Sequence, residues 1–169
     1  MNKLSYISIG LGLFLVACSQ QIAQTQSLNV PEAGSYYHGV YPGGKTGEED
    51  DLKIEDLQSY ETTVGKEVAW VYFSNNWFHG QVFPVETASW IRQEGAVPFI
   101  RLMLRSSAET DIAESEYTLE SIIAGTFDEQ LKTWGEDARA FETPIIVEWG
   151  TEMNGQWFSW NGHWNGKAD

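Results

Sequence analysis

The stretch IIVEWGTEMNGQWFSWNGHWNGKAD, residues 145–169, joins an apolar run to a loop rich in Trp, Asn and Gly. The β-branched residues of the run predict a strand, and Glu152 follows directly after it. No helical pattern comes after this strand in the sequence given, although a buried strand needs cover on both faces. We therefore expect a truncated chain whose last strand belongs to a larger fold.

Further apolar segments precede this strand, and helical patterns separate them. Strands are predicted in residues 36–44, 67–77, 96–104 and 143–152, and helices in residues 47–65, 84–95, 118–125 and 127–142. Regular β/α alternation of this kind predicts a parallel sheet. The predicted strands are apolar on both faces, which is expected when helices or a barrel interior cover both sides.

Two α/β architectures fit the alternation: a small open sheet, or the first half of a (β/α)8 barrel, the TIM barrel. Residues 36–169 make up about half of a typical barrel, which has roughly 250 residues. The uncovered last strand favours the barrel. We therefore predict four βα units of a TIM barrel, truncated after strand four.

The N-terminal residues predict export and a lipid anchor rather than a part of the fold. Lys3 precedes an apolar run, residues 7–17, that is shorter than the roughly 20 residues needed to span a bilayer. Such a run is typical of a secretory signal. It ends in LVAC, which resembles the lipobox of bacterial lipoproteins and implies lipid modification of Cys18. An ordinary cleaved signal peptide is the alternative.

Three segments follow from this reading of the chain. Residues 1–17 are the predicted signal peptide, and residues 18–35 are a polar, flexible tether that carries the lipid. Residues 36–169 are the predicted N-terminal part of a catalytic domain. The protein is thus expected to be exported and anchored to a bacterial membrane, on its periplasmic or cell-surface side. Cys18 is the single cysteine, which excludes a disulfide within the chain.

The charge balance argues against nucleic acid as a partner. The chain has 24 acidic and 10 basic residues, a formal net charge of −14, whereas nucleic-acid phosphates are bound by Lys and Arg. A neutral partner is expected instead. The three histidines lack the spacing of a zinc site, and the acidic run at residues 48–51 is predicted to be a solvated helix start. No metal and no cofactor are expected.

Polar and aromatic residues gather where the predicted strands end, which is where active sites lie in (β/α)8 enzymes. Glu152 follows strand four, and residues 75–77 and 105–107 follow strands two and three. Flat aromatic rings and amide side chains complement the C–H faces and the hydroxyl groups of sugars. The candidate sugar-binding residues are Trp77, Asn154, Trp157 and Trp160. Packing within the loops is the alternative for each tryptophan ring.

The segment EWGTEMNGQWFSW, residues 148–160, resembles the HEMNG-x-W signature of glycoside hydrolase family 26, a clan-A family best known for β-mannanases. Looser similarity covers most of residues 36–169. The resemblance implies a TIM barrel, a polysaccharide substrate such as mannan, and the role of general acid/base for Glu152. It also implies that Trp157 borders the bound sugar. Two positions depart from the family's pattern: Thr151 stands where His is usual, and Glu148 where Arg is common.

Glycoside hydrolysis needs a second carboxylate, and Glu148 is unsuited to that role. Glu148 and Glu152 lie on the same side of the predicted strand, but roughly 13 Å apart at about 3.3 Å per residue. Retaining glycosidases hold their carboxyl groups about 5–5.5 Å apart, and inverting ones roughly 6.5–9.5 Å. We predict instead that Glu148 pairs with Arg101 of the neighbouring strand. The resemblance places the nucleophile at the end of strand seven, so this fragment alone is expected to be inactive.

Three functions remain open. The first is a membrane-anchored glycosidase that hydrolyses a β-linked polysaccharide with retention of configuration, most similar to an endo-β-1,4-mannanase. The second is a non-catalytic surface lipoprotein that binds carbohydrate. The third is a complete small α/β domain of unrelated function.

Overall fold

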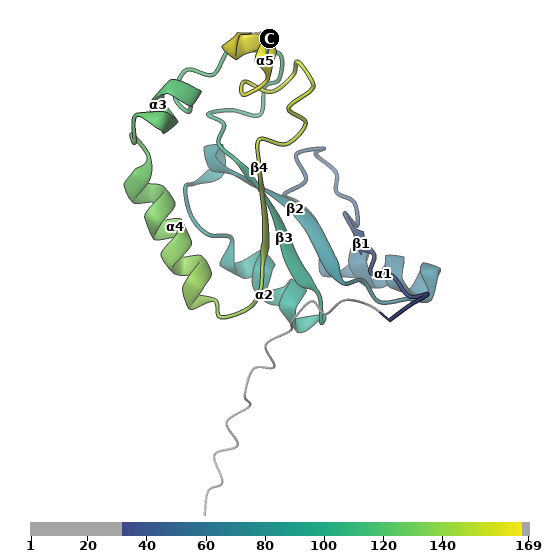
Figure 1. Cartoon of the computed structure of the whole chain (residues 1–169). Coiled ribbons are helices and arrows are strands. Elements are labelled where there is room, and N and C mark those ends of the chain that lie inside the picture. Colours follow the sequence, from purple (N-terminus) through teal and green to yellow (C-terminus); the bar gives the residue numbers. More distant parts are fainter. Residues whose placement is uncertain (1–31, 167–169) are drawn as a thin grey trace, which may run out of the picture.

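The structure, a computed structural model, describes residues 32–166, which form a parallel β-sheet with helices between its strands (Figure 1). The strands are β1 (Gly39–Val40), β2 (Trp70–Asn76), β3 (Val97–Met103) and β4 (Ile146–Trp149). The helices are α1 (Ile54–Val64), the 3₁₀ helix η1 (Trp77–His79), α2 (Val85–Gln93), α3 (Leu119–Ile123), α4 (Asp128–Ala140) and α5 (Gly162–Asn165). The predicted α/β class is confirmed.

The predicted signal peptide and Cys18 lie outside the described residues, as does most of the predicted tether. Residues 32–35 are exposed and belong to no helix or strand. Within residues 32–166, no helix is both long enough and apolar enough to cross a membrane.

The four strands lie side by side in chain order, and every neighbouring pair is parallel. Ser74 of β2 is opposite Arg101 of β3, and Arg101 is opposite Glu148 of β4. Because side chains alternate between the two faces of a strand, these three residues share one face of the sheet. Phe73 and Ile100 are paired one position earlier and therefore point to the other face.

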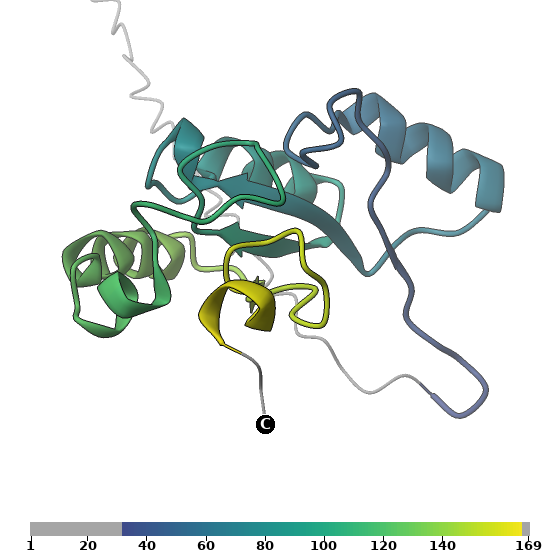
Figure 2. The same cartoon turned by 90° about the horizontal axis from the view of Figure 1, so that it is seen from above.

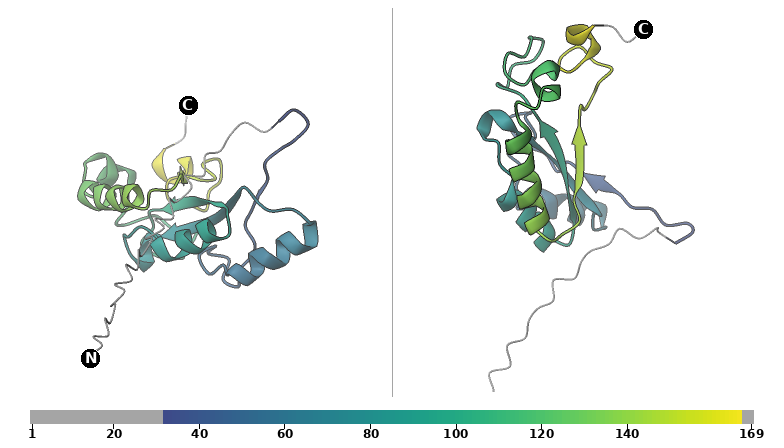
Figure 3. Two further views of the ribbon diagram at one scale, coloured as in Figure 1. Left: turned by 90° about the horizontal axis from the view of Figure 1, so that it is seen from below. Right: turned by 60° about the vertical axis from the view of Figure 1, so that its left-hand side comes forward.

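Helices α1, α2 and α4 cover a single face of the sheet. They follow one another around that side in Figure 2 and in the left view of Figure 3. Leu57 of α1, Ile91 of α2 and Trp134 of α4 belong to the same buried cluster as Phe73 and Ile100. The hydrophobic core therefore lies between these helices and one face of the sheet, and the opposite face carries the polar row of three residues described above.

Two strands differ from their predicted form. β1 is only two residues long, because Pro42 has no N–H to donate and Gly43, with a φ of 107°, turns the chain away. In β4, Val147 and Trp149 are 43% and 47% exposed. The expectation that every strand is covered on both faces is therefore wrong for β4.

The acidic run at residues 48–51 does not begin the first helix, contrary to prediction. Helix α1 begins at Ile54, and Gly65 ends it with a left-handed φ of 67° and an N–H donated to the Glu61 carbonyl. The acidic run instead belongs to a bent segment before the helix. Three of its four side chains are paired with residues in or just after β2 and β3, and Asp51 is paired within the bent segment.

Candidate functional site

A pocket of about 170 Å³ lies at the carboxyl ends of the strands. The segment that follows β4, yellow in Figure 1, contributes Glu152 and Trp157 to its lining. The segment after β1 contributes Glu49, and the polar face of the sheet contributes Ser74 and Arg101. Residues that are far apart in the sequence therefore meet around Glu152, where the sequence placed the candidate site.

The carboxylate of Glu152 is held on two sides and remains partly open to solvent. The indole Nε1 of Trp157 donates a hydrogen bond of 2.6 Å to Oε2, and Nη2 of Arg101 lies 3.6 Å from Oε1. The side chain is 42% exposed. Glu152 itself has a left-handed φ of 53°, a conformation that costs free energy for a residue with a side chain. The turn after β4 therefore holds this carboxylate on a strained backbone.

Gly155 allows Trp157 to fold back over this turn. A Cβ atom at position 155 would lie 2.6 Å from the Trp157 ring. The N–H of Gly155 donates to the carbonyl of Glu152 at 2.9 Å, which closes the turn. The Trp157 ring is 42% exposed, so one part of it holds Glu152 and another part can contact a ligand.

Trp160 and Asn161 build the loop around Glu152. Trp160 stacks on Phe158 with ring centroids 4.6 Å apart, and its Nε1 donates to the Thr151 carbonyl at 2.7 Å. Asn161 is fully buried; its amide donates to the Glu152 carbonyl and accepts from the Phe158 N–H, both at 2.8 Å. The Trp160 indole therefore holds the loop together through the Thr151 carbonyl and the Phe158 ring. Asn161 was missed because nothing in the sequence distinguishes a buried loop amide from an exposed one.

Arg101 is the centre of the charged groups in the site. Its Nη1 lies 3.0 Å from a Glu49 carboxylate oxygen, its Nε lies 3.5 Å from Glu148, and its Nη2 faces Glu152. The guanidinium also stacks over the Tyr72 ring, 4.6 Å from its centroid. The predicted pair of Glu148 and Arg101 is confirmed as an ion pair, although the Arg101 Nε–H is not aligned for a hydrogen bond.

The first three residues of the acidic run at 48–51 pair with residues in or just after β2 and β3, so the predicted solvated helix start is wrong. Glu48 lies 3.3 Å from the Arg105 guanidinium, and Glu49 reaches Arg101. Asp50 accepts a hydrogen bond of 2.8 Å from the Asn76 amide. Glu49 has a left-handed φ of 59°. Glu48 and Glu49 thus line one side of the pocket.

Asp51 completes the acidic run and binds within its own segment. The backbone N–H of Lys45 donates to its carboxylate at 2.7 Å, and the hydroxyl of Thr46 donates at 3.2 Å. These bonds, that of Lys45 first, hold the pKa of Asp51 below its ordinary value. Asp51 therefore shapes the loop and does not face the pocket.

Three of the four predicted sugar-binding residues, Trp77, Asn154 and Trp160, do not line this pocket. Trp77 is only 2% exposed and packs edge-on against Tyr117 in the core, with centroids 5.6 Å apart; its ring offers no face to a ligand here. Asn154 is exposed on the turn after β4 but does not line the pocket. Of the aromatic candidates, Trp157 has the exposed ring at the pocket.

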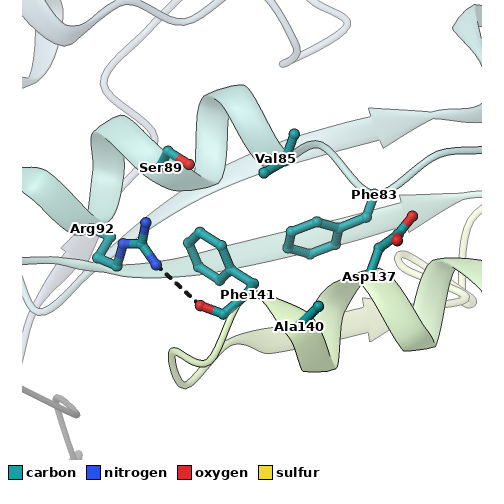
Figure 4. Close-up of a pocket in the computed structure, with 7 residues that line it drawn as sticks. All are labelled: Phe83, Val85, Ser89, Arg92, Asp137, Ala140 and Phe141. Atoms are coloured by element: carbon teal, nitrogen blue, oxygen red, sulfur yellow. Dashed lines mark hydrogen bonds between the residues drawn. The ribbon is translucent and has the colours of Figure 1, made fainter. Parts of the chain in front are cut away.

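Within residues 32–166, no group of three or more His, Cys, Asp or Glu side chains could hold a metal ion. A larger groove of about 450 Å³ lies between α2 and α4 (Figure 4). There Arg92 donates to the Phe141 carbonyl at 3.0 Å and stacks over the Phe141 ring. This groove is on the helical side of the sheet, whereas Ser74 and Arg101 of the pocket beside Glu152 are on the other face.

The chain matches no protein-family model and no curated protein. The resemblance to glycoside hydrolase family 26 therefore rests on residues 148–160 and on the looser similarity of residues 36–169.

Proposed function

We propose that this protein is a glycoside hydrolase with Glu152 as its general acid/base. The observation that carries the proposal is the placement of Glu152 at the end of β4, hydrogen-bonded to a half-exposed tryptophan at the rim of a pocket. The aromatic ring can pack against a sugar ring while the carboxylate lies beside the glycosidic bond to be cleaved. The resemblance of the EMNG segment makes β-1,4-mannan the first substrate to test, with attack inside the polysaccharide.

We also propose that the sheet is part of a (β/α)8 barrel. Its strands follow chain order and the packed helices cover one face, whereas a doubly wound sheet has helices on both faces. In a barrel the other face points to the interior, and the site lies at the carboxyl ends of the strands. Ser74, Arg101 and Glu148 would then be interior residues beneath the site.

In the proposed reaction, Glu152 donates its proton to the glycosidic oxygen as the bond to the anomeric carbon breaks. A second carboxylate attacks that carbon, and a water then displaces it while Glu152 takes a proton from the water. The configuration is retained. Glu49 and Glu148 are both paired with Arg101, so neither is assigned as the nucleophile. The resemblance places the nucleophile on a seventh strand, outside the described residues.

Replacement of Glu152 by Gln tests the proposal, in the protein expressed from its complete gene. Gln keeps the shape of the side chain but transfers no proton, so hydrolysis of β-1,4-mannan is expected to fall by about 10²–10⁴-fold. Glu142→Gln is the matched control, because Glu142 also has a φ of 53° but follows α4, away from the pocket. Equal hydrolysis by the two variants would remove Glu152 from the reaction.

A sugar-binding protein without hydrolytic activity is the second candidate. It is favoured by the pairing of Glu49 and Glu148 with Arg101, because these are the two carboxylates that share this guanidinium with Glu152. A binder would take up β-1,4-mannooligosaccharides and release no reducing ends. Calorimetric titration beside a reducing-end assay separates the two functions, because only a hydrolase gives a signal in both.

We further propose that the protein is exported and anchored through a lipid on Cys18. The LVAC ending of the apolar run and the polar segment after it support this location. A site tethered outside the cytoplasmic membrane would meet polysaccharides too large to enter the cell.

A further inference from the structure

One guanidinium binds carboxylates from three separate parts of the chain. Glu49 comes from the segment after β1, Glu148 from within β4, and Glu152 from the turn that follows β4. Each meets a different nitrogen of Arg101, namely Nη1, Nε and Nη2 in that order. The planar guanidinium presents its donors in fixed directions. The position of one carboxylate is therefore tied to the positions of the other two.

Arg101 is itself held firmly in place. Its side chain is 13% exposed, the Tyr72 ring lies against its guanidinium, and the Tyr72 hydroxyl reaches the Glu148 carboxylate at 3.3 Å. Ser74 donates its backbone N–H to the Glu49 carbonyl at 2.8 Å and lies 3.2 Å from the Glu49 carboxylate through its hydroxyl. Two of the three acids are thus anchored to the sheet as well as to Arg101.

Glu152 is the most exposed of the three acids. It is 42% exposed, against 25% for Glu49 and 35% for Glu148. Its side-chain partners in the described residues are Arg101 and Trp157. Both Glu152 and Glu49 have a left-handed backbone, with φ of 53° and 59°, and such strain persists only where the surroundings enforce it.

We propose that Arg101 is a positioning residue for Glu152: Glu49 and Glu148 hold the guanidinium, and its Nη2 then fixes the direction of the Glu152 carboxylate toward the pocket. The catalytic consequence rests on the proposed function. Arg101 acts through Glu152 and need not touch the sugar. A lysine at position 101 would keep the positive charge but lose the planar guanidinium with its fixed donor directions. It could not direct three carboxylates at once.

The test replaces Arg101 by Lys in the protein expressed from its complete gene. We expect kcat for β-1,4-mannan to fall about 100-fold, as for a misplaced catalytic group, with KM nearly unchanged. We also expect the NMR signal of the Trp157 indole N–H to move, because the hydrogen bond to Glu152 loses its fixed acceptor. Arg92→Lys is the matched control, since Arg92 also stacks on an aromatic ring but lies in the groove between α2 and α4.

Glu49→Gln is a second variant in case the lysine variant does not fold. It weakens one anchor of the guanidinium and should lower kcat by a smaller factor, again without a rise in KM. An unchanged kcat and an unmoved indole signal in a folded Arg101→Lys protein would overturn the inference. A wild-type protein that hydrolyses no glycan would overturn the proposed function, and the indole signal would still decide whether Arg101 fixes Glu152.

Discussion

The direction of the Glu152 carboxylate depends on a glycine three positions away. Trp157 donates the shortest hydrogen bond to Glu152, and the Trp157 ring lies where a side chain on Gly155 would be. The glycine of the EMNG segment therefore acts through the tryptophan. The spacing of Glu152, Gly155 and Trp157 thus has a structural reason: the glycine leaves room for the ring that binds the carboxylate.

Replacing Gly155 by Ala should displace the Trp157 ring and release Glu152 from its hydrogen bond. We expect a loss of mannan hydrolysis on the order of 10²-fold and a shift in tryptophan fluorescence. Gly135→Ala is the control: Gly135 is an exposed residue in α4 with nothing within 4 Å of an added Cβ. That change should stabilise the protein by about 0.5–1 kcal/mol and leave hydrolysis unaltered. Similar kinetic effects from the two variants would contradict the role of Gly155.

Glu148 stands where the resemblance implies an arginine, and the structure supplies an arginine from elsewhere. The resemblance leads one to expect Arg four residues before the acid/base, and here the residue is acidic. The guanidinium near Glu152 comes instead from Arg101 on the neighbouring strand. A positive group thus lies beside Glu152, but it comes from a different position than the one that the resemblance implies.

The segment at residues 45–51 contains a carboxylate whose contribution to stability depends on pH. It carries four consecutive acids, and hydrogen bonds from Lys45 and Thr46 lower the pKa of Asp51 below its ordinary value of 3.8. A lowered folded-state pKa means that Asp51 stabilises the fold above the unfolded-state pKa. That contribution is lost as the pH falls through the folded-state pKa.

Asp51→Asn should therefore destabilise the protein near neutral pH and matter less in acid. We expect the difference in free energy of unfolding between wild type and variant to shrink as the pH falls below 3.8. Urea unfolding at pH 6 and at pH 2.5 would measure it. A difference that is equal at both pH values would show that the hydrogen bonds to Asp51 do not depend on its charge.

Elements with a clear hydrophobic period were predictable, and contacts between distant residues were not. Strands β2 and β3 and helices α2 and α4 lie within their predicted ranges, because apolar spacing reports directly on strand and helix. Glu49 was missed because its partner Arg101 is 52 positions away. Trp77 was expected at the site because it follows β2, but its burial depends on Tyr117, which lies on a later loop.

For the whole molecule, the sequence predicts attachment to a membrane through Cys18. Cys18→Ser should abolish incorporation of labelled fatty acid and release the protein from the membrane fraction, because a lipid anchor needs that thiol. Metabolic labelling with fractionation measures both effects. Ser19→Ala is the control, because it changes the neighbouring residue and leaves the Cys18 thiol in place; this variant should stay in the membrane fraction. Loss of the protein from membranes in both variants, or in neither, would argue against the anchor.

The division of the sheet into a helical face and a polar face has a consequence for insertions and deletions. Along β2 and β3, neighbouring positions alternate between core and site: Ile100 packs under the helices and Arg101 binds the carboxylates. Removing a single residue from β3 would exchange these faces downstream of the deletion. It would bury a guanidinium and expose core residues to the pocket. Changes in chain length should therefore be tolerated in the loops between elements and not within these two strands.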